Sequence, residues 1–570
     1  MVFSSPAWVP DIPWEIPDSI PLGQATLAGL NGDSEKSATD VLLVDPISGK
    51  SYSRADLKQR VEWLAGGVAK ELGWSTNEGS PWDKVVAIYS LNTIDFFALS
   101  WAIHRLNGIC LLLNPTSSVG EMISHMTAAK CGVIFTCETL VSTSVEVATR
   151  LSIAQSRIFT LPLPDGFLKN PEPTDGFKSL EDLVALGLQV QPPEPLVWRK
   201  GQAKEQVAYL CSTSGTSGKQ KLAMITHYSL TINTLQMSAH ENVQGESWHP
   251  HAVSGVLPFT HVYGLFIGHV AAWRGETLIV LPRFDMQLML QSVQQYRIAR
   301  LYLVPPIVVA LTNNPFLFEM FDLSSVTSIA NGASGLDRSL ADKVYAQLPN
   351  CKVLPGYGLT ETAVLTNLTG AHDTWAGSSG SLLPLTEARL VGPDGEEIES
   401  LDKPGEILFS APNLFIGYLG NPEATKAAFD ERGWLRTGDI GMFKKSPNGT
   451  EHLFVLDRIK DMIKVKGLQV VPVDIEVVLR EHPAVADVAV IGVPDENAGE
   501  RAKAFVVRSQ SGRDEHDEED LREMIDDYVQ ERLDETHWLH DRIMFVEALP
   551  KSASGKVLKR ELRALAAEWN

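Results

Sequence analysis

Hydrophobic positions in the first 360 residues form short apolar runs that alternate with segments of helical periodicity. Residues 85–89 (VVAIY) form an apolar run of strand length, whereas residues 53–72 place apolar side chains at helical spacing and stop before Gly73. A helix predicted over 94–106 and a strand over 108–113 repeat the alternation. Strands separated by helices usually pair in parallel and are covered by helices, so the pattern predicts an α/β fold.

The same rhythm continues to about residue 330. A further helix is predicted over 121–129, and further strands over residues 133–136, 207–211, 252–257, 277–281, 301–304 and 326–330. Two stretches lack this rhythm. Residues 1–40 are rich in Pro, Gly and Ser and are expected to wrap the surface, and the proline-rich residues 165–205 are expected to form a long connection.

The pattern changes in the last third of the chain. Residues 385–456 show short strands with turn signals, which predict a β-rich subdomain. Strands at 485–491 and 504–507 and an acidic run that starts a helix at 513–520 indicate a separate α+β unit. We therefore expect a large N-terminal domain of mixed and parallel sheets with helices (residues 1–457) and a small C-terminal α+β domain (residues 458–570).

Composition narrows the classes of partner and compartment. The net charge of −21 over 570 residues disfavours nucleic acid and anionic membranes, so a site for ATP would have to be locally basic. The N-terminus does not look like a signal peptide, no apolar stretch is long enough to span a bilayer, and the C-terminus is not Ser-Lys-Leu. The cysteines are odd in number, lack CxxC spacing and read as reduced thiols: Cys110, Cys131, Cys137, Cys211 and Cys351. The cytosol is the expected compartment.

Residues 212–221 (STSGTSGKQK) follow the apolar run 207–211 and are the first candidate site. Small residues let the backbone turn its N–H groups toward an anion, and a lysine adds positive charge, so a phosphate loop is one interpretation. A flexible Ser/Gly linker is the other. A Walker loop is excluded because Thr213 stands at the place of its first glycine and Gln220 at the place of its Ser or Thr.

Residues 355–361 (PGYGLTE) form the second candidate site. Glycines on both sides of an aromatic residue let the backbone approach a flat ring, which Tyr357 could cover. Glu361 offers one carboxylate, which suffices for Mg²⁺ when phosphates supply the other ligands. A plain turn with a surface glutamate is the competing interpretation.

Four further segments carry candidate chemistry. Asp439 ends the turn 435–439 (LRTGD) and could accept both hydroxyls of a ribose, although Thr-Gly-Asp is more often a simple turn. In residues 457–472, lysines and arginines stand among apolar residues. This segment could carry basic site residues or could form a solvated cationic hairpin. Lys556, in a glycine-containing loop near the C-terminus, could reach a developing phosphate charge or belong to a basic tail. His261 in residues 257–265 could border a pocket or be structural.

These six segments, in their order along the chain, resemble the motifs of the adenylate-forming superfamily, in particular the acyl-CoA ligases similar to 4-coumarate and other aryl-CoA ligases. The resemblance covers about residues 40–565. The chain departs from the usual phosphate-loop pattern at Gln220 and Leu222, where the family has Pro and Gly, and at Leu435, where it has Tyr. The phosphate-loop lysine is Lys221 by this alignment.

The resemblance implies a role for each matching residue. Catalytic groups would be Lys556 in adenylation, Lys464 in thioester formation, Thr360 at the α-phosphate and His261 at the acyl site. ATP and AMP would be bound by Ser212, Thr213, Ser214, Gly215, Thr216, Ser217, Gly218, Lys221, Gly332, Ala333, Ser334, Gly356, Tyr357, Gly358, Asp439 and Arg458. The metal would be held by Glu361 and Thr216. Lys460 would be the hinge of a mobile C-terminal domain, and Lys466, Gly467 and Gln469 would contact CoA. The acyl pocket would be lined by His261, Tyr263, Ile267, Asn331, Ala333 and Gly356.

The resemblance therefore implies an ATP-dependent carboxylic acid–CoA ligase that uses ATP, Mg²⁺ and CoA. An aryl, arylalkyl or medium-chain acid is the expected substrate, and His261 in place of an Asp disfavours an α-amino acid. Two alternatives stay open: a stand-alone adenylation enzyme that passes the acyl group to an amine or a separate carrier protein, and a non-catalytic nucleotide-binding protein.

Overall fold

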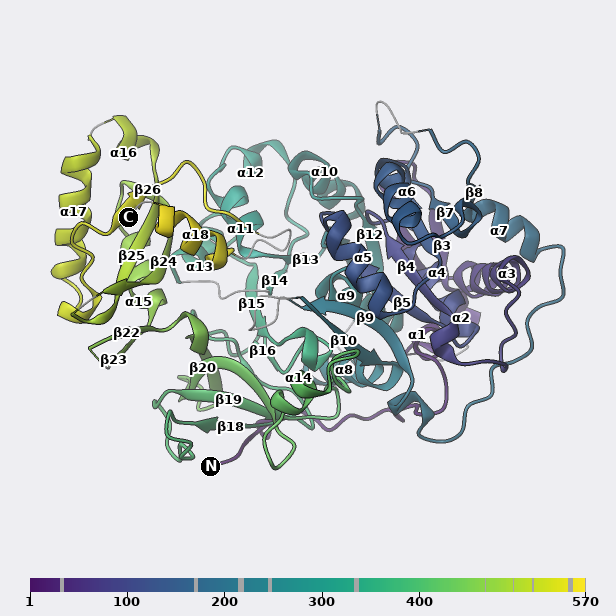
Figure 1. Cartoon of the computed structure of the whole chain (residues 1–570), viewed down its shortest axis with the longest axis horizontal. Coiled ribbons are helices and arrows are strands. Elements are labelled where there is room, and N and C mark those ends of the chain that lie inside the picture. Colours follow the sequence, from purple (N-terminus) through teal and green to yellow (C-terminus); the bar gives the residue numbers. More distant parts are fainter. Residues whose placement is uncertain are drawn as a thin grey trace.

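The computed structural model describes residues 1–570 except for 31–34, 169–172, 214–219, 244–248, 333–337, 467, 496, 515–516, 552–556 and 569–570. Figure 1 shows a large N-terminal part and a smaller C-terminal part at one end of it. The described N-terminal part contains three β-sheets, and the C-terminal part contains one. The α/β class expected from the sequence is confirmed.

The first large sheet has the strand order β10-β9-β5-β4-β6-β7-β8, and all neighbours except the β10–β9 pair run parallel. Its strands are β4 (Val85–Tyr89), β5 (Ile109–Leu113), β6 (Ile134–Cys137), β7 (Ile158–Leu161), β8 (Lys178–Ser179), β9 (Val207–Thr213) and β10 (Lys221–Thr226). Four of the inner strands are buried at every position because both faces of the sheet are covered.

The second large sheet has the order β17-β16-β15-β14-β13-β11-β12-β2-β3, with a parallel centre and antiparallel edges. Its strands are β2 (Val41–Val44), β3 (Ser51–Ser53), β11 (Ala252–Gly255), β12 (Thr277–Val280), β13 (Arg300–Leu303), β14 (Ser328–Asn331), β15 (Lys352–Tyr357), β16 (Asn367–Leu368) and β17 (Ser381–Leu382).

The third sheet is the β-rich unit predicted near 385–456. It consists of β18 (Glu387–Val391), β19 (Gly405–Ser410), β20 (Leu435–Lys445) and β21 (Glu451–Arg458), joined antiparallel, and β1 (Phe3–Ser4) pairs with β18 at its edge. The N-terminus thus belongs to this sheet.

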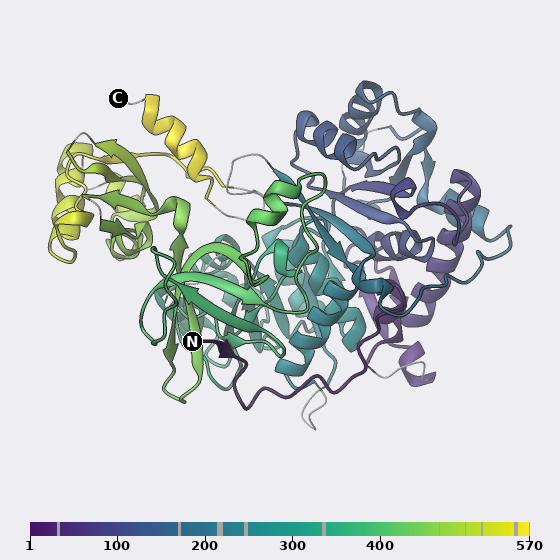
Figure 2. The ribbon, with the colours of Figure 1, turned by 60° about the horizontal axis from the view of Figure 1, so that its bottom comes forward.

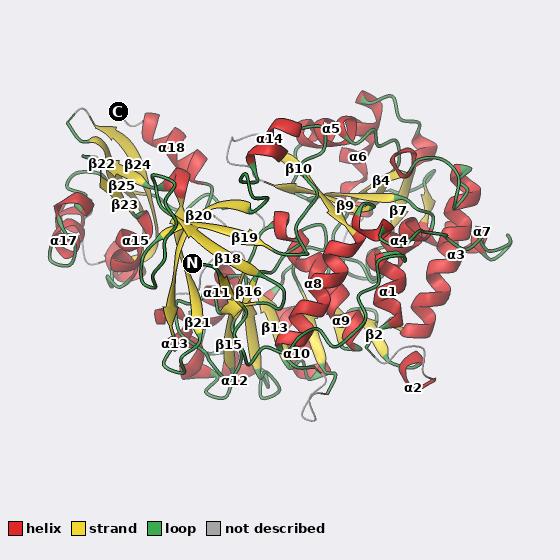
Figure 3. Ribbon diagram, turned by 90° about the horizontal axis from the view of Figure 1, so that it is seen from below, coloured by secondary structure: helices red, strands yellow, loops and turns green. Residues whose placement is uncertain are grey.

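Helices fill the space between and around the two large sheets. Figure 3 shows α1, α4, α8 and α9 between them, where their side chains form the largest hydrophobic core. The helices of the N-terminal part are α1 (Leu22–Ala28), α2 (Glu35–Ala38), α3 (Arg54–Leu72), α4 (Phe96–Arg105), α5 (Val119–Ala128), α6 (Val141–Arg150), α7 (Leu180–Gly187), α8 (His227–His240), α9 (Val262–Arg274), α10 (Met286–Tyr296), α11 (Pro305–Thr312), α12 (Leu317–Met320), α13 (Arg338–Gln347) and α14 (Pro422–Ala427).

The C-terminal part has its own sheet and its own cores, made of residues from Ile463 onward. Its strands are β22 (Ile463–Val465), β23 (Leu468–Val470), β24 (Val485–Asp495), β25 (Gly499–Arg508) and β26 (Ile543–Phe545), and its helices are α15 (Pro472–Arg480), α16 (Gln510–Asp514), α17 (Glu518–Gln530) and α18 (Lys559–Glu568). The predicted boundary near residue 458 and the mobility of this unit stay predictions.

Local signals explain the elements that were predicted well. Ser53 and Asp56 form a capping box at the start of α3, and Gly73 ends the helix in the left-handed conformation at φ 70°. The strand predicted over residues 85–89 is β4 without any shift. No helix among the described residues is long and apolar enough to cross a membrane.

Three predictions need correction. Residues 1–40 do more than wrap the surface, because α1 buries Leu22 and Leu27 in the main core. The connection 165–205 contains β8 and α7, whose Leu180, Leu183 and Val184 are buried at helical spacing. The acidic run at 513–520 does start a helix, α17, as predicted, but its first residues belong to the end of α16.

Candidate active site

The strands β9 and β10 hold both ends of the predicted phosphate loop. Thr213 pairs with Lys221, and Ser212 pairs with Leu222, across the antiparallel ladder. Five predicted residues of the loop lie outside the described residues: Ser214, Gly215, Thr216, Ser217 and Gly218. The structure therefore places the base of the loop, with Thr213 opposite Lys221.

Both departures from the family's loop pattern involve α5. Gln220 donates a hydrogen bond of 2.8 Å from Nε2 to Oε1 of Glu121, whose other oxygen caps the first turn of α5 at Ser118. Leu222 is buried in the same hydrophobic cluster as Met122 of α5. A proline at 220 and a glycine at 222 could make neither contact, so α5 supports the loop in this chain.

Glu361 is held by two hydroxyl groups from different elements. It lies in the short 3₁₀ turn η5 (Thr360–Thr362), which follows β15 after Gly358 and Leu359. Its Oε1 accepts hydrogen bonds from Oγ1 of Thr213 at 3.1 Å and from the hydroxyl of Tyr418 at 2.7 Å. The ammonium of Lys221 lies 4.8 Å from the centre of the Tyr418 ring, a cation–π distance. Burial, reinforced by the negative charge of Glu361, raises the pKa of Tyr418, so its hydroxyl is a donor at neutral pH.

This donor set fits Mg²⁺ when phosphates accompany it. Mg²⁺ takes one or two carboxylates and completes its shell with water and phosphate oxygens. Among the described residues, no group of three or more His, Cys, Asp and Glu side chains could hold a metal alone. Glu361 would thus be a carboxylate ligand of a metal that arrives with a nucleotide.

Asp439 contacts two other predicted nucleotide-binding residues, Tyr357 and Arg458. Its Oδ2 accepts a hydrogen bond of 2.6 Å from the hydroxyl of Tyr357, and its Oδ1 lies 3.3 Å from Nε of Arg458. Asp439 and Arg458 are also direct partners in the β20–β21 ladder. Burial, followed by the charge of Asp439, raises the pKa of Tyr357, which stays protonated and donates. The three side chains form one charged and hydrogen-bonded group at the end of β15.

Gly358 is required by a close backbone approach. A Cβ atom at this position would lie 1.6 Å from the carbonyl oxygen of Val364. The segment from Tyr357 to Glu361 is therefore pressed against the chain that follows it. We call Asp439, Tyr357 and Arg458 the Asp439 group. Because the segment from Tyr357 to Glu361 is short, this group and the Glu361 carboxylate are neighbours in the fold.

His261 begins α9 and accepts a hydrogen bond of 3.2 Å at Nδ1 from the backbone N–H of Tyr263. Desolvation lowers the pKa of His261 to about 4, so the imidazole is neutral at pH 7. A neutral ring can border an apolar acyl group without a charge. It offers no counter-ion to a substrate ammonium.

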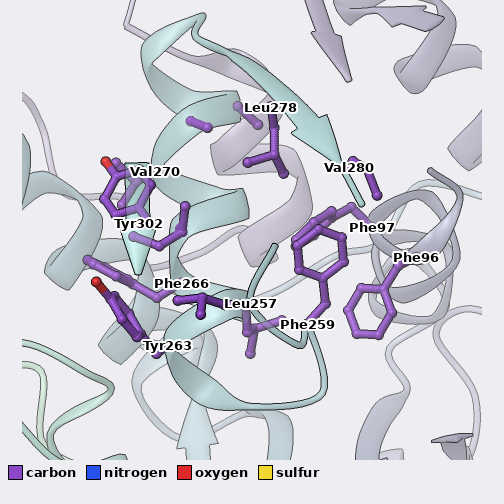
Figure 4. Close-up of a cluster of buried hydrophobic side chains, with 14 of the residues drawn as sticks. Phe96, Phe97, Leu257, Phe259, Tyr263, Phe266, Val270, Leu278, Val280 and Tyr302 are labelled. Atoms are coloured by element: carbon purple, nitrogen blue, oxygen red, sulfur yellow. The ribbon is translucent and has the colours of Figure 1, made fainter. Parts of the chain in front are cut away.

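The other predicted acyl-pocket residues that the structure describes lie on α9 and near the ends of β14 and β15. Tyr263 donates a hydrogen bond of 3.4 Å to the carbonyl of Ala330, and a Cβ on Gly332 would lie 2.8 Å from its ring. Asn331 ends β14 and Gly356 lies in β15. A narrow crevice beyond Tyr263 is lined by Ser254, Gly255, Leu257, Phe259, Gly264, Ile267 and Tyr302. Figure 4 shows Leu257, Phe259, Tyr263 and Tyr302 in this buried region, together with further aromatic and aliphatic side chains. Ala333 and Ser334 lie outside the described residues.

The predicted residues of the second half-reaction are held within the C-terminal part. Lys464 is exposed on β22, and its backbone N–H donates to Glu500 at 2.8 Å. Lys466 pairs with Glu535 at 3.4 Å. Gln469 is the ladder partner of Lys464 on β23. The β22–β23 hairpin thus pairs with β25 through its backbone and with Glu535 through the Lys466 ion pair. Gly467 and Lys556 lie outside the described residues.

Sequence reasoning missed Tyr418 and Glu121. Tyr418 lies in the loop between β19 and α14, 57 positions after Glu361, and no local signal links the two. Glu121 looked like an ordinary residue of the first turn of a helix. Gln220 stands just before β10, and its contact with Glu121 joins segments 99 positions apart, so no local signal links the two.

Comparison with known proteins agrees with this geometry. The chain matches the family model described as "AMP-binding enzyme" over residues 33–419 and the "AMP-binding enzyme C-terminal domain" over residues 474–556. It is 57% identical to the acyl-CoA ligase easD of Emericella nidulans, over 99% of this chain and 100% of that protein. It is 53% identical to the acyl-CoA ligase cm3C of Cordyceps militaris, over 100% of this chain and 91% of that protein.

Solved structures share the fold over nearly the whole chain. ATP-bound MatB from Rhodopseudomonas palustris is 26% identical, with a TM-score of 0.79 over 95% of this chain and 98% of that one. The anthranilate CoA ligase AuaEII, solved with anthranoyl-AMP, is 20% identical, has a TM-score of 0.80 over 97% of this chain and 98% of that one, and supports the fold alone. The chain belongs to the AMP-binding enzyme family, the adenylate-forming enzymes that activate acids with ATP, and within it to the acyl-CoA ligases.

Proposed function

We propose that this protein joins a carboxylic acid to CoA in two steps at one site. A carboxylate oxygen attacks the α-phosphorus of ATP and pyrophosphate leaves, which gives an acyl-adenylate. The thiol of CoA then attacks the acyl carbonyl carbon and AMP leaves. The observation that carries the proposal is the segment from Tyr357 to Glu361, which joins the Asp439 group to the Thr213 and Tyr418 hydroxyls.

The nucleotide would lie along this segment. Asp439 would accept the ribose hydroxyls with Arg458 beside it, and Tyr357 would cover the adenine. Thr360 would contact the α-phosphate, and Lys221 with the loop from Ser212 to Gly218 would hold the outer phosphates. Gly332, Ala333 and Ser334 would line the other face of the base. The hydrogen bond from Tyr357 to Asp439 supports this placement because it fixes the carboxylate beside the predicted base site.

Mg²⁺ would be held by Glu361, with Thr216 as a further ligand. When bound, it would neutralise phosphate charge and orient the pyrophosphate for departure. The two hydroxyls on Glu361 support this role because they fix the direction of the carboxylate before a metal arrives.

The C-terminal domain would supply a different lysine to each step. Lys556 would stabilise the charge that develops at the α-phosphate during adenylation. Rotation about Lys460 would then withdraw it and bring Lys464 to the site, with Lys466, Gly467 and Gln469 along the path of CoA. The exposed position of Lys464 on a hairpin of the C-terminal part is consistent with a residue that reaches the site only after rotation.

The acid is proposed to be an aryl, arylalkyl or medium-chain acid that enters past His261. The crevice whose lining includes Leu257, Phe259 and Tyr302 supports an apolar acyl group. The neutral imidazole of His261 argues against an ammonium on the substrate. The cytosol is the proposed compartment, since the five cysteines are free thiols.

A pyrophosphate-release screen with benzoates, cinnamates and C4–C16 fatty acids tests the proposal. We expect release to depend on one class of acid, on Mg²⁺ and on ATP, and to yield an acyl-CoA when CoA is added. Acyl transfer to an amine or a carrier protein but not to CoA would favour the stand-alone adenylation enzyme. No release with any acid would contradict catalysis.

A further inference from the structure

One ion pair in this structure crosses the predicted hinge. Lys559, the first residue of α18, lies 3.6 Å from Oδ2 of Asp457. Asp457 belongs to β21, before Lys460, whereas Lys559 belongs to the C-terminal part. Figure 2 shows α18 on the side of the C-terminal part that faces the N-terminal part.

The pair is shielded from water. The side chains of Lys559 and Asp457 are 16% and 8% exposed. Oδ1 of Asp457 accepts from the backbone N–H of Arg458, but Oδ2 is buried and accepts no hydrogen bond from the described residues. The ammonium of Lys559 is therefore the counter-charge of this oxygen, and its loss would leave a buried charge without compensation.

Lys559 has a second partner that does not cross the hinge. Oε1 of Glu476, on α15, lies 3.7 Å from its ammonium. Glu476 is otherwise satisfied, since it accepts from the backbone N–H of Val490 at 2.9 Å and from Arg480 at 3.0 Å. A rotation about Lys460 would keep Lys559 beside Glu476 but would separate it from Asp457.

We propose that the Lys559–Asp457 ion pair holds the C-terminal domain in the pose for adenylation, and that Lys559 is a positioning residue for that pose. This inference rests on the proposed function, because it takes Lys460 as the hinge and Lys556 as the adenylation lysine. Lys559 follows Lys556 by three residues in the sequence. A contact that holds the start of α18 against β21 is therefore expected to act on the step that Lys556 serves.

A second ion pair on the same helix provides a matched control. Arg563 donates to Oδ1 of Asp461 at 2.8 Å, and both residues follow Lys460 in the chain. Rotation about the hinge leaves this pair intact. Removing it therefore perturbs α18 and the hinge turn η6 (Ile459–Asp461) without favouring either pose.

The first experiment measures the two half-reactions separately in Lys559→Met and Asp457→Asn. We expect pyrophosphate release to fall about fivefold, the order of effect of a partly shielded ion pair, because less of the enzyme occupies the adenylation pose. Thioester formation from a supplied acyl-adenylate should be unchanged or faster. Lys559→Arg should restore the wild-type ratio, and Arg563→Met should change both rates alike or neither. An equal loss in both half-reactions of the hinge-crossing variants would overturn the proposal.

The second experiment needs no activity. Spin labels at Glu319→Cys on α12 and Asp527→Cys on α17, both exposed, report the distance between the two parts, since the native cysteines are buried. Lys559→Met should populate a second distance, whereas Arg563→Met should not. Unchanged distances in Lys559→Met would overturn the inference. A wild-type enzyme that releases no pyrophosphate would refute the proposed function instead, and the distances would still decide whether the pair sets the pose.

Discussion

The hydroxyl of Tyr418 donates a hydrogen bond of 2.7 Å to the Glu361 carboxylate, while its ring lies under the ammonium of Lys221. One side chain thus contacts both the predicted metal ligand and the predicted phosphate lysine. It links the loop after β19 to the base of the phosphate loop.

Tyr418→Phe should weaken metal use without loss of the fold. The ring under Lys221 stays, but Glu361 loses one of its two hydroxyl donors and becomes less well oriented. We expect the Mg²⁺ concentration for half-maximal pyrophosphate release to rise about fivefold, as for the loss of about 1 kcal/mol. Tyr418→Leu should in addition raise the KM for ATP, because the Lys221 contact is lost. An unchanged Mg²⁺ requirement in Tyr418→Phe would show that Thr213 alone orients Glu361.

A change of charge at position 220 should alter ATP binding, because this side chain contacts the carboxylate of Glu121. Gln220→Glu places a second carboxylate beside Glu121, and we expect the KM for ATP to rise about threefold while the KM for the acid stays constant. Gln220→Lys replaces the hydrogen bond by an ion pair and should restore the wild-type value. Equal effects of both substitutions on steady-state kinetics would mean that the contact with α5 does not matter.

Gly358→Ala should destabilise the protein because its new Cβ would overlap the carbonyl of Val364. We expect a loss of about 3 kcal/mol in the free energy of unfolding, measured by urea denaturation. Gly120→Ala in α5 is the control, since its Cβ would meet no atom within 4 Å, and it should stabilise the helix by up to about 1 kcal/mol. Similar stability of both variants would contradict the close approach at Gly358.

Acid should destabilise the protein through histidines in the main core. Burial lowers the pKa of His104 to about 3 and of His269 to about 4, and it lowers the pKa of His227 strongly. The unfolded chain binds these protons below about pH 6.5 but the folded chain does not, so stability is full above that pH and falls as pH decreases. Between pH 7.5 and pH 5.5, each of these histidines should lower the free energy of unfolding by about 1.4 kcal/mol.

Urea unfolding at the two pH values measures this loss. His104→Gln keeps a donor for the carbonyl of Ala208 and should lose about 1.4 kcal/mol less than the wild type on acidification. His249→Gln, at an exposed position, should behave like the wild type. An identical pH dependence in His104→Gln would mean that other groups cause the acid loss.

The regular elements could be predicted because each carries its own local signal. The apolar run 85–89 is β4, and Ser53 and Gly73 bound α3. The helix α7 was missed because the prolines around it suggested a connection. The strand β1 was missed because two residues carry no periodicity, and only pairing with β18 makes them a strand.

The candidate site shows the same division. The residues in the motifs could be named from their order along the chain, but their partners could not. Tyr418 reaches Glu361, and Gln220 reaches Glu121, through contacts between segments 57 and 99 positions apart. Such contacts depend on the packing of whole sheets, which no local pattern encodes.

The central claim is that this protein forms an acyl-adenylate and transfers its acyl group to CoA. The most direct measurement uses a carboxylic acid labelled with ¹⁸O in both carboxylate oxygens, together with ATP, Mg²⁺ and CoA, and determines the masses of the products. The mechanism predicts one ¹⁸O atom in AMP, one in the acyl-CoA and none in pyrophosphate. Unlabelled AMP, or label in released phosphate together with ADP, would contradict it.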